Sequence, residues 1–191
     1  MSDPAPPPDD SSVSNAGQAA GELWARAKAA FRARDYDGAA ALLERLLTEA
    51  PGAAQIEMAD VRLLAGVTLL RIGRTDEALP HLRLAAQLDP DNARAHQKLG
   101  AGIARQGLEA EALPHLERAA RLAPGNAEYQ WRLGDQYRRL GRLAEAKAAL
   151  ERSLALDPGY RRASDGLAAL ARRRGSWLTR LARAWKGKRP A

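Results

Sequence analysis

Apolar side chains in the first part of the chain follow the spacing of single helix faces. Trp24, Ala27 and Phe31 lie three or four residues apart, which places them on one side of a helix. After a polar turn at residues 34–37, a second set has the same kind of spacing: Ala39, Leu42, Leu43, Leu46 and Leu47. Pro51 ends this second stretch, because the residue before a proline is pushed out of the helical conformation. The pattern predicts a helical hairpin over residues 20–51.

The block from Ala93 to Pro124 predicts another hairpin, and its residues recur at one fixed interval earlier and later in the chain. The pair Leu99-Gly100 returns as Leu133-Gly134. Four further positions recur in the same register: Gly73, Gly107 and Gly141; Ala78, Ala112 and Ala146; Leu82, Leu116 and Leu150; Pro90, Pro124 and Pro158. A fixed period of about 34 residues is typical of helical solenoids, in which each unit buries its apolar face against the next. The repeat predicts hairpins over residues 53–90, 93–124 and 127–158.

The join between the first two hairpins is longer than the others. Ala78 follows Ala39 at a wider interval than Ala112 follows Ala78, and the added residues, around 54–58, include no helix breaker. We therefore expect an extended helix from about Ala53 to Ile72, ended by a left-handed Gly73. Thr75 is the expected cap of the next helix. Small side chains recur where the two helices of a hairpin cross, and we expect close packing at Gly100, Ala112, Ala119, Gly134 and Ala146.

Composition supports an all-helical protein with tails. Alanine and leucine dominate, aromatic residues make up 5%, and the absence of cysteine excludes disulfides and thiolate metal sites. Residues 1–19 combine proline, aspartate and serine with few large apolar groups, so we expect a disordered leader rather than a signal peptide. No uninterrupted apolar stretch is long enough to span a membrane. A capping helix is expected at residues 159–175, followed by a basic amphipathic tail at residues 176–191.

The net charge of +7 is concentrated in that tail, since residues 172–191 hold eight bases and no acid. On a helical wheel one face of the tail is apolar and the other basic: Trp177, Leu178, Leu181 and Trp185 against Arg180, Arg183 and Lys186. Two interpretations stay open. Gly175 follows Gly141 by one repeat period, so the tail fits the second helix of a degenerate fifth hairpin. Tryptophan beside leucine with cations opposite is also typical of a helix that docks on an anionic membrane surface or on a partner. Nucleic acid is the least favoured partner.

Candidate catalytic chemistry is sparse. His81 and His115 are one repeat period apart, so the repeat itself explains their recurrence, and we expect a structural or surface role for both. Paired acids such as Asp76 and Glu77 lie in first turns of predicted helices, where they complement the helix dipole. No nucleophile triad, phosphate-binding glycine loop or HExxH motif occurs. We expect no enzyme activity, no cofactor and no metal site.

The repeat resembles the tetratricopeptide repeat family. The family pattern W-x2-L-G-x2-Y…A-x3-F…P is matched best by Leu133, Gly134, Tyr137, Ala146, Leu150 and Pro158. The usual tryptophan is replaced by Arg62, His96 and Gln130. The resemblance implies a right-handed α-solenoid of four helix-turn-helix repeats with a C-terminal capping helix. It also implies a concave groove, lined by the first helix of each hairpin, that holds a peptide or a helix of a partner.

By register with the family, the groove candidates are Lys28, Arg71, Arg94, Gln97, Lys98, Arg105, Trp131, Asp135 and Arg138. Arg94 and Lys98 match two basic positions of the clamp with which some members bind acidic carboxyl-terminal peptides, whereas Trp24, Lys28 and Leu64 depart from the other clamp positions. We therefore expect a non-catalytic cytoplasmic adaptor that binds a protein partner, with a preference for acidic segments. The alternative is a scaffold attached peripherally to the membrane through its tail.

Overall fold

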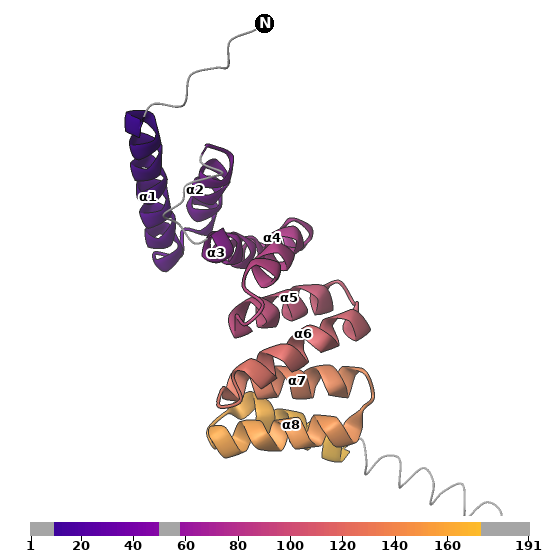
Figure 1. Ribbon diagram of the computed structural model, residues 1–191. Coiled ribbons are helices and arrows are strands. Elements are labelled where there is room, and N and C mark those ends of the chain that lie inside the picture. The colour runs from indigo at the N-terminus through magenta and orange to yellow at the C-terminus, as the bar shows by residue number, and fades with distance from the viewer. Residues whose placement is uncertain (1–9, 50–57, 173–191) are drawn as a thin grey trace, which may run out of the picture. The chain divides into compact units, whose positions relative to one another are not determined.

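The computed structural model describes residues 10–49 and 58–172, and this part of the chain contains helices and no strands (Figure 1). The helices are α1 (Asp10–Arg32), α2 (Tyr36–Glu49), α3 (Met58–Arg71), α4 (Thr75–Leu88), α5 (Ala93–Arg105), α6 (Glu109–Leu122), α7 (Ala127–Arg139) and α8 (Leu143–Leu156). A further helical segment covers residues 161–172. The chain divides into two compact units, Met1–Asp91 and Asn92–Ala191. The expected all-helical fold is confirmed.

One predicted boundary is wrong, and other predicted segments lie outside the described residues. α1 begins at Asp10, so residues 10–19 are helical and the prediction of a disordered leader over 1–19 is wrong for that part. No proline occurs between Asp10 and Arg32, so no residue type in this stretch prevents a continuous helix. The helix is anchored further along, where Ala20 is fully buried. The expected extension of α3 back to Ala53 lies outside the described residues, as do the last residues of the expected capping helix, 173–175, and the basic tail at residues 176–191.

The first unit packs two hairpins, α1 with α2 and α3 with α4 (Figure 1). Ala20, Leu23 and Ala27 of α1 meet Leu43 and Leu46 of α2, and the same cluster continues into Val61 and Ala65 of α3. α3 is buried along most of its length, because it packs both on α4 and on α2. The sharing of one helix between neighbouring hairpins is how a repeat array builds a continuous core.

The second unit repeats this arrangement with α5 and α6, then α7 and α8. Leu116 and Ala120 of α6, Leu133 of α7 and Ala149 of α8 form its central cluster. Two buried polar side chains join helix ends across it: Gln136 donates from Nε2 to the Glu109 carbonyl at 2.7 Å, and Ser153 donates from Oγ to the Ala127 carbonyl at 2.8 Å. These bonds satisfy groups that would otherwise be costly to bury.

Within each of three hairpins the helices touch at a glycine. A Cβ placed on Gly66 would lie 2.5 Å from Leu82 Cγ, and one on Gly100 or Gly134 would lie 2.8 Å from Cγ of the matching leucine, Leu116 or Leu150. Ala112, Ala119 and Ala146 are also buried. The prediction that small residues mark the helix crossings is confirmed.

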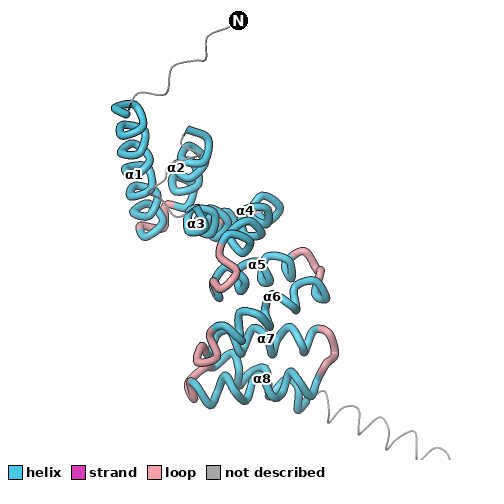
Figure 2. The backbone as a smooth tube through the Cα atoms, viewed as in Figure 1, coloured by secondary structure: helices cyan, strands magenta, loops and turns pink. Residues whose placement is uncertain are grey.

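The turns between paired helices are short (Figure 2) and share one conformation. Gly73, Gly107 and Gly141 have φ values of 84°, 77° and 75°, as expected for glycines that end a helix. In the first hairpin Arg34 takes the same role at φ 63°. The expected cap at Thr75 is wrong: Thr75 is the first residue of α4, and Arg74 occupies the cap position without a side-chain cap bond. The turn consists of residues 72–74, so its last residue, Arg74, takes the cap position and Thr75 falls inside the helix.

Candidate functional site

Trp131 is the tryptophan of α7, the first helix of the hairpin that α7 forms with α8. α7 is capped by Asn126, whose side chain accepts a hydrogen bond from Tyr129 N at 3.1 Å, and this cap fixes where the helix begins. Trp131 is half-buried, and its ring centroid lies 5.9 Å from that of Tyr160 with a 51° angle between the ring planes. Tyr160 stands just before the helical segment 161–172, so the two aromatic rings come from different elements.

Two arginines lie against the Trp131 ring. Arg162 Cζ is 5.1 Å and Arg132 Cζ is 5.2 Å from the ring centroid, both within cation–π range. Arg132 is also paired with Glu128 at 2.8 Å. We call Trp131, Tyr160, Arg132, Arg162 and Glu128 the Trp131 cluster. The cluster combines two aromatic rings with two arginines and one glutamate, so its net charge is positive.

The electrostatics place residues of α5 near the same cluster. Burial opposes ionisation of Glu128, but the hydrogen bond from Arg132 and the charges of Arg132, Lys98 and Arg162 together hold the pKa of this carboxyl below its ordinary value. Burial raises the pKa of Tyr129, and Arg94 counteracts part of that rise. The predicted basic pair Arg94 and Lys98 therefore acts on side chains at the start of α7, and Arg94 is exposed. Charges of α5 and of the segment 161–172 thus both act on ionisable side chains at the start of α7.

The other predicted groove residues of the second unit differ in their surroundings: some are in ion pairs, one is exposed and one is buried. Arg138 is ion-paired with Asp135, with its Nε 3.0 Å from Oδ1, and Arg139 also reaches Asp135 at 3.1 Å. Arg105, at the end of α5, is exposed. Gln97 is only 1% exposed, so its prediction as a ligand-contacting residue needs correction: the helix rotation that exposes Arg94 turns Gln97 into the interior.

Lys28 and Arg71 belong to the first unit. Lys28 Nζ lies 4.9 Å from the centroid of the Trp24 ring, and Arg71 is exposed at the end of α3. The tail candidates Trp177 to Lys186 lie outside the described residues.

Four members of the Trp131 cluster escaped sequence reasoning: Tyr160, Arg162, Arg132 and Glu128. The repeat register held a usable signal, since Arg94, Glu128 and Arg162 occupy one repeat position. Arg162 was assigned to a cap rather than to a binding surface because the family pattern ends at Pro158.

The histidines have side-chain partners that the sequence did not reveal. His81 of α4 accepts a hydrogen bond at Nδ1 from Arg62 Nη1 of α3 at 3.2 Å. One repeat later, Nδ1 of His96 lies 3.3 Å from Nδ1 of His115, and the ring planes are 21° apart. In the described ranges, no group of three or more histidine, aspartate or glutamate side chains could hold a metal ion. No described helix has the length and apolarity that a membrane span requires.

Comparisons with known proteins point to one fold. Family models described as tetratricopeptide repeat match residues 30–101 and 127–160, together more than half of the chain. Among solved structures, a MamA protein aligns with a TM-score of 0.74 at 24% identity over 83% of this chain and 84% of that one. MamA 41-end from Desulfovibrio magneticus RS-1 aligns with a TM-score of 0.73 at 18% identity, covering 90% and 97%.

YrrB, described as a TPR protein with an unusual peptide-binding site, aligns with a TM-score of 0.70 at 22% identity over 78% of this chain and 75% of that one. No curated protein matches the sequence. At these identities the structural matches establish a shared fold of stacked helical hairpins.

Proposed function

Since the chain belongs to the tetratricopeptide repeat family, whose fold serves protein interaction, we propose that it is a non-catalytic adaptor that holds a segment of a partner protein on the Trp131 cluster. The partner segment is a peptide or a helix with acidic residues. Cytoplasmic location is part of the same proposal.

The observation that carries this proposal is the half-buried Trp131 with two guanidinium groups on its ring. Tryptophan and arginine are the side chains that most often dominate binding energy at protein interfaces. Their pairing here holds both in a fixed geometry before a ligand arrives, which lowers the entropy lost on binding. Arginine also recognises carboxylates through two parallel hydrogen bonds, so the surplus of cations favours an acidic ligand.

YrrB supports the idea that this fold accommodates peptides, since its description mentions a peptide-binding site. The charges of Lys98 and Arg94 on α5 act on Glu128 and Tyr129 of α7, which supports including this basic pair in the proposed site. Asp135 and Arg138 contribute less, because each already has an ion-pair partner on α7.

A peptide-display selection on the purified full-length chain tests the proposal. We expect enriched peptides to carry acidic residues and to bind Trp131→Ala at least tenfold more weakly, the loss typical of a hot-spot residue. The double variant Arg94→Glu with Lys98→Glu should lose affinity as well. Trp24→Ala is the matched control, because Trp24 lies on the first helix of the first hairpin with a cation, Lys28, on its ring. Selected peptides that bind Trp131→Ala and Trp24→Ala equally would refute the proposed site.

The basic tail supports a second candidate function, a scaffold attached to an anionic membrane. Its support is the sequence pattern of tryptophan and leucine opposite arginine and lysine at residues 177–186. Co-sedimentation with vesicles of phosphatidylserine and phosphatidylcholine separates the two functions. The adaptor proposal expects equal sedimentation of the full chain and of a chain ending at Arg174, whereas the membrane alternative requires that only the full chain sediments.

A further inference from the structure

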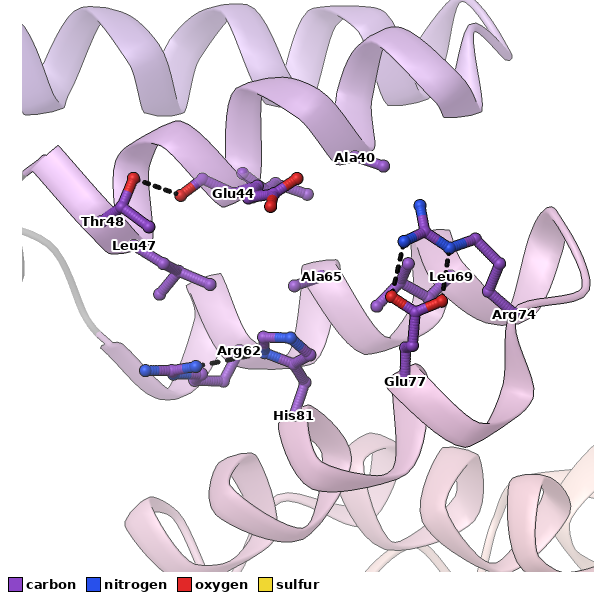
Figure 3. Close-up of a pocket in the computed structure, with 11 residues that line it drawn as sticks. Ala40, Glu44, Leu47, Thr48, Arg62, Ala65, Leu69, Arg74, Glu77 and His81 are labelled. Atoms are coloured by element: carbon purple, nitrogen blue, oxygen red, sulfur yellow. Dashed lines mark hydrogen bonds and ion pairs between the residues drawn. The ribbon is translucent and has the colours of Figure 1, made fainter.

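A pocket of about 310 Å³ opens between α2, α3 and α4 in the first unit (Figure 3). Its apolar lining comes from α2 and α3: Ala40, Leu43, Leu47, Ala65 and Leu69. Its polar lining is Glu44, Thr48, Arg62, Arg74, Glu77 and His81. The volume is at the low end for ligand sites, so the pocket suits the end of a chain or one side chain rather than a helix.

Arg62 is the cation of this pocket whose charge is not balanced. Its guanidinium is half-buried, and its Nε is buried without a hydrogen-bond partner. The described residues offer it one partner, His81 Nδ1, and no carboxylate. Since a guanidinium can only donate, His81 accepts at Nδ1 and carries its proton on Nε2. Burying a guanidinium without a carboxylate partner costs folding free energy. An anion that pairs with Arg62 would offset this cost, so Arg62 is suited to binding one.

The opposite end of the pocket holds one cation, Arg74, and two carboxylates, Glu44 and Glu77, so negative charge is in excess there. Arg74 donates from Nε to Glu77 at 2.6 Å, and Glu44 also attracts Arg74 from α2. Figure 3 shows Arg62 and Thr48 toward one end and the Arg74–Glu77 pair toward the other, with Ala65 between them. The pocket therefore has a positive end at Arg62 and a negative end, where Glu44 and Glu77 lie near Arg74.

We propose that this pocket is a second binding site, which takes a single carboxylate next to an aliphatic side chain from a peptide segment. The carboxylate pairs with Arg62, and the aliphatic group covers Leu43, Leu47 and Leu69. Glu44 and Glu77 exclude a run of acidic residues, because a second carboxylate would meet like charge there. The site lies in the first unit and does not depend on the Trp131 cluster.

Protonation of His81 should strengthen this site. Burial and the charge of Arg62 on α3 lower the pKa of His81, while Glu77 of α4 acts in the opposite direction. From α2, Glu44 is the charged side chain that lines the same pocket. A carboxylate bound at Arg62 would add negative charge beside the ring, so ligand binding and proton uptake by His81 favour each other.

The test is titration of the 15N-labelled full chain with N-acetyl-leucine, followed through the Nε–H resonance of Arg62 in heteronuclear spectra. N-acetyl-leucine combines a free carboxylate with an isobutyl group. We expect a saturable shift with a dissociation constant of about a millimolar, as ligand efficiency allows for so small a molecule. N-acetyl-leucinamide, which lacks the charge, should bind at least tenfold more weakly.

Three variants sharpen the result. Arg62→Gln should abolish the shifts at α2 and α3 amides, and Thr48→Glu should weaken binding at least tenfold by placing a carboxylate at the Arg62 end of the pocket. Arg45→Gln is the matched control, since Arg45 is exposed on α2 and paired with Glu49 outside the pocket. Binding that is equal in Arg62→Gln and Arg45→Gln, or no saturable shift at all, would overturn the proposal. Either result leaves the Trp131 proposal untouched, because its peptides are tested on different residues.

Discussion

Gly100 of α5 lies directly against Leu116 of α6, so closely that a Cβ on the glycine would be 2.8 Å from Leu116 Cγ and 3.1 Å from the Ala112 carbonyl oxygen. The same contact recurs at Gly66 with Leu82 and at Gly134 with Leu150. Each helix pair is thus set at a distance that only a residue without a side chain permits.

Gly100→Ala should therefore destabilise the chain although alanine is the better helix former. The gain in helix propensity is about 1 kcal/mol, whereas forcing a methyl group against Leu116 and a backbone carbonyl costs about 1–3 kcal/mol. We expect a net loss of about 1 kcal/mol in urea denaturation. Gly125→Ala is the control, because nothing lies within 4 Å of its added Cβ. Equal stability of the two variants would contradict the close contact.

The left-handed turn residues make a paired prediction. Gly107 has φ 77° and Arg34 has φ 63°. Gly107→Ala should destabilise by about 1 kcal/mol, because side chains are disfavoured in this conformation, and Arg34→Gly should leave stability unchanged or raise it by up to about 1 kcal/mol. Thermal unfolding of both variants beside the parent measures the two effects. A loss of stability in Arg34→Gly would show that the arginine side chain does more than occupy the turn.

His81 should make stability depend on pH in the acidic range. Burial and Arg62 lower its pKa in the folded chain below the ordinary value of 6.5. The unfolded chain then binds more protons than the folded one as pH falls below about 6.5, so the stabilising contribution of neutral His81 is present above that pH and is lost below it. His81→Gln should show a weaker decrease between pH 7.5 and pH 5 in urea denaturation than the parent chain does. Parallel curves would mean that His81 does not titrate differently on folding.

Tyr137 should act at the opposite end of the pH scale. Burial and its hydrogen bond to Glu117 Oε1, 2.7 Å long, raise the pKa of Tyr137 to about 12. Since the folded pKa exceeds the unfolded value of about 10, this contribution is present below pH 10 and is lost as pH rises toward 12. The pKa values of Tyr129 and Tyr160 are also raised, so absorbance at the tyrosinate band should show several late phenols, and Tyr137→Phe should remove the step near pH 12. At pH 7 the same variant should lose about 1 kcal/mol, because Glu117 loses its donor.

Much of the architecture was readable from spacing alone. The recurrence of Gly107, Ala112 and Leu116 at one constant interval predicted the hairpins, their turns and their close crossings. Each of these residue types is required locally, either by the backbone conformation of a turn or by packing within one repeat. Such local requirements can be recognised from the type of residue at each position. The start of α1 differs from the prediction, because polar composition argued for disorder over residues 10–19, whereas the packed part of the helix begins at Ala20.

The candidate sites were less predictable, because they depend on which side chains of different helices meet. Register placed Trp131 and Arg94 correctly on first helices, but Gln97, three positions from Arg94, is buried. Arg62 and His81 stand at separate positions in the pattern, and only packing of α3 on α4 reveals their hydrogen bond. Residue type indicates that a charge is present; the fold decides what faces it.

The contact between Trp131 and Tyr160 has a consequence for how this protein can be shortened. The repeat pattern ends at Pro158, which suggests a natural place to cut, yet Tyr160 and Arg162 come after it and cover the tryptophan ring. A fragment that stops at Pro158 would keep the hairpin of α7 and α8 but would lack Tyr160 and Arg162, two of the side chains in the Trp131 cluster. The minimal fragment for ligand work must therefore extend past Arg162 and keep the helical segment that holds it.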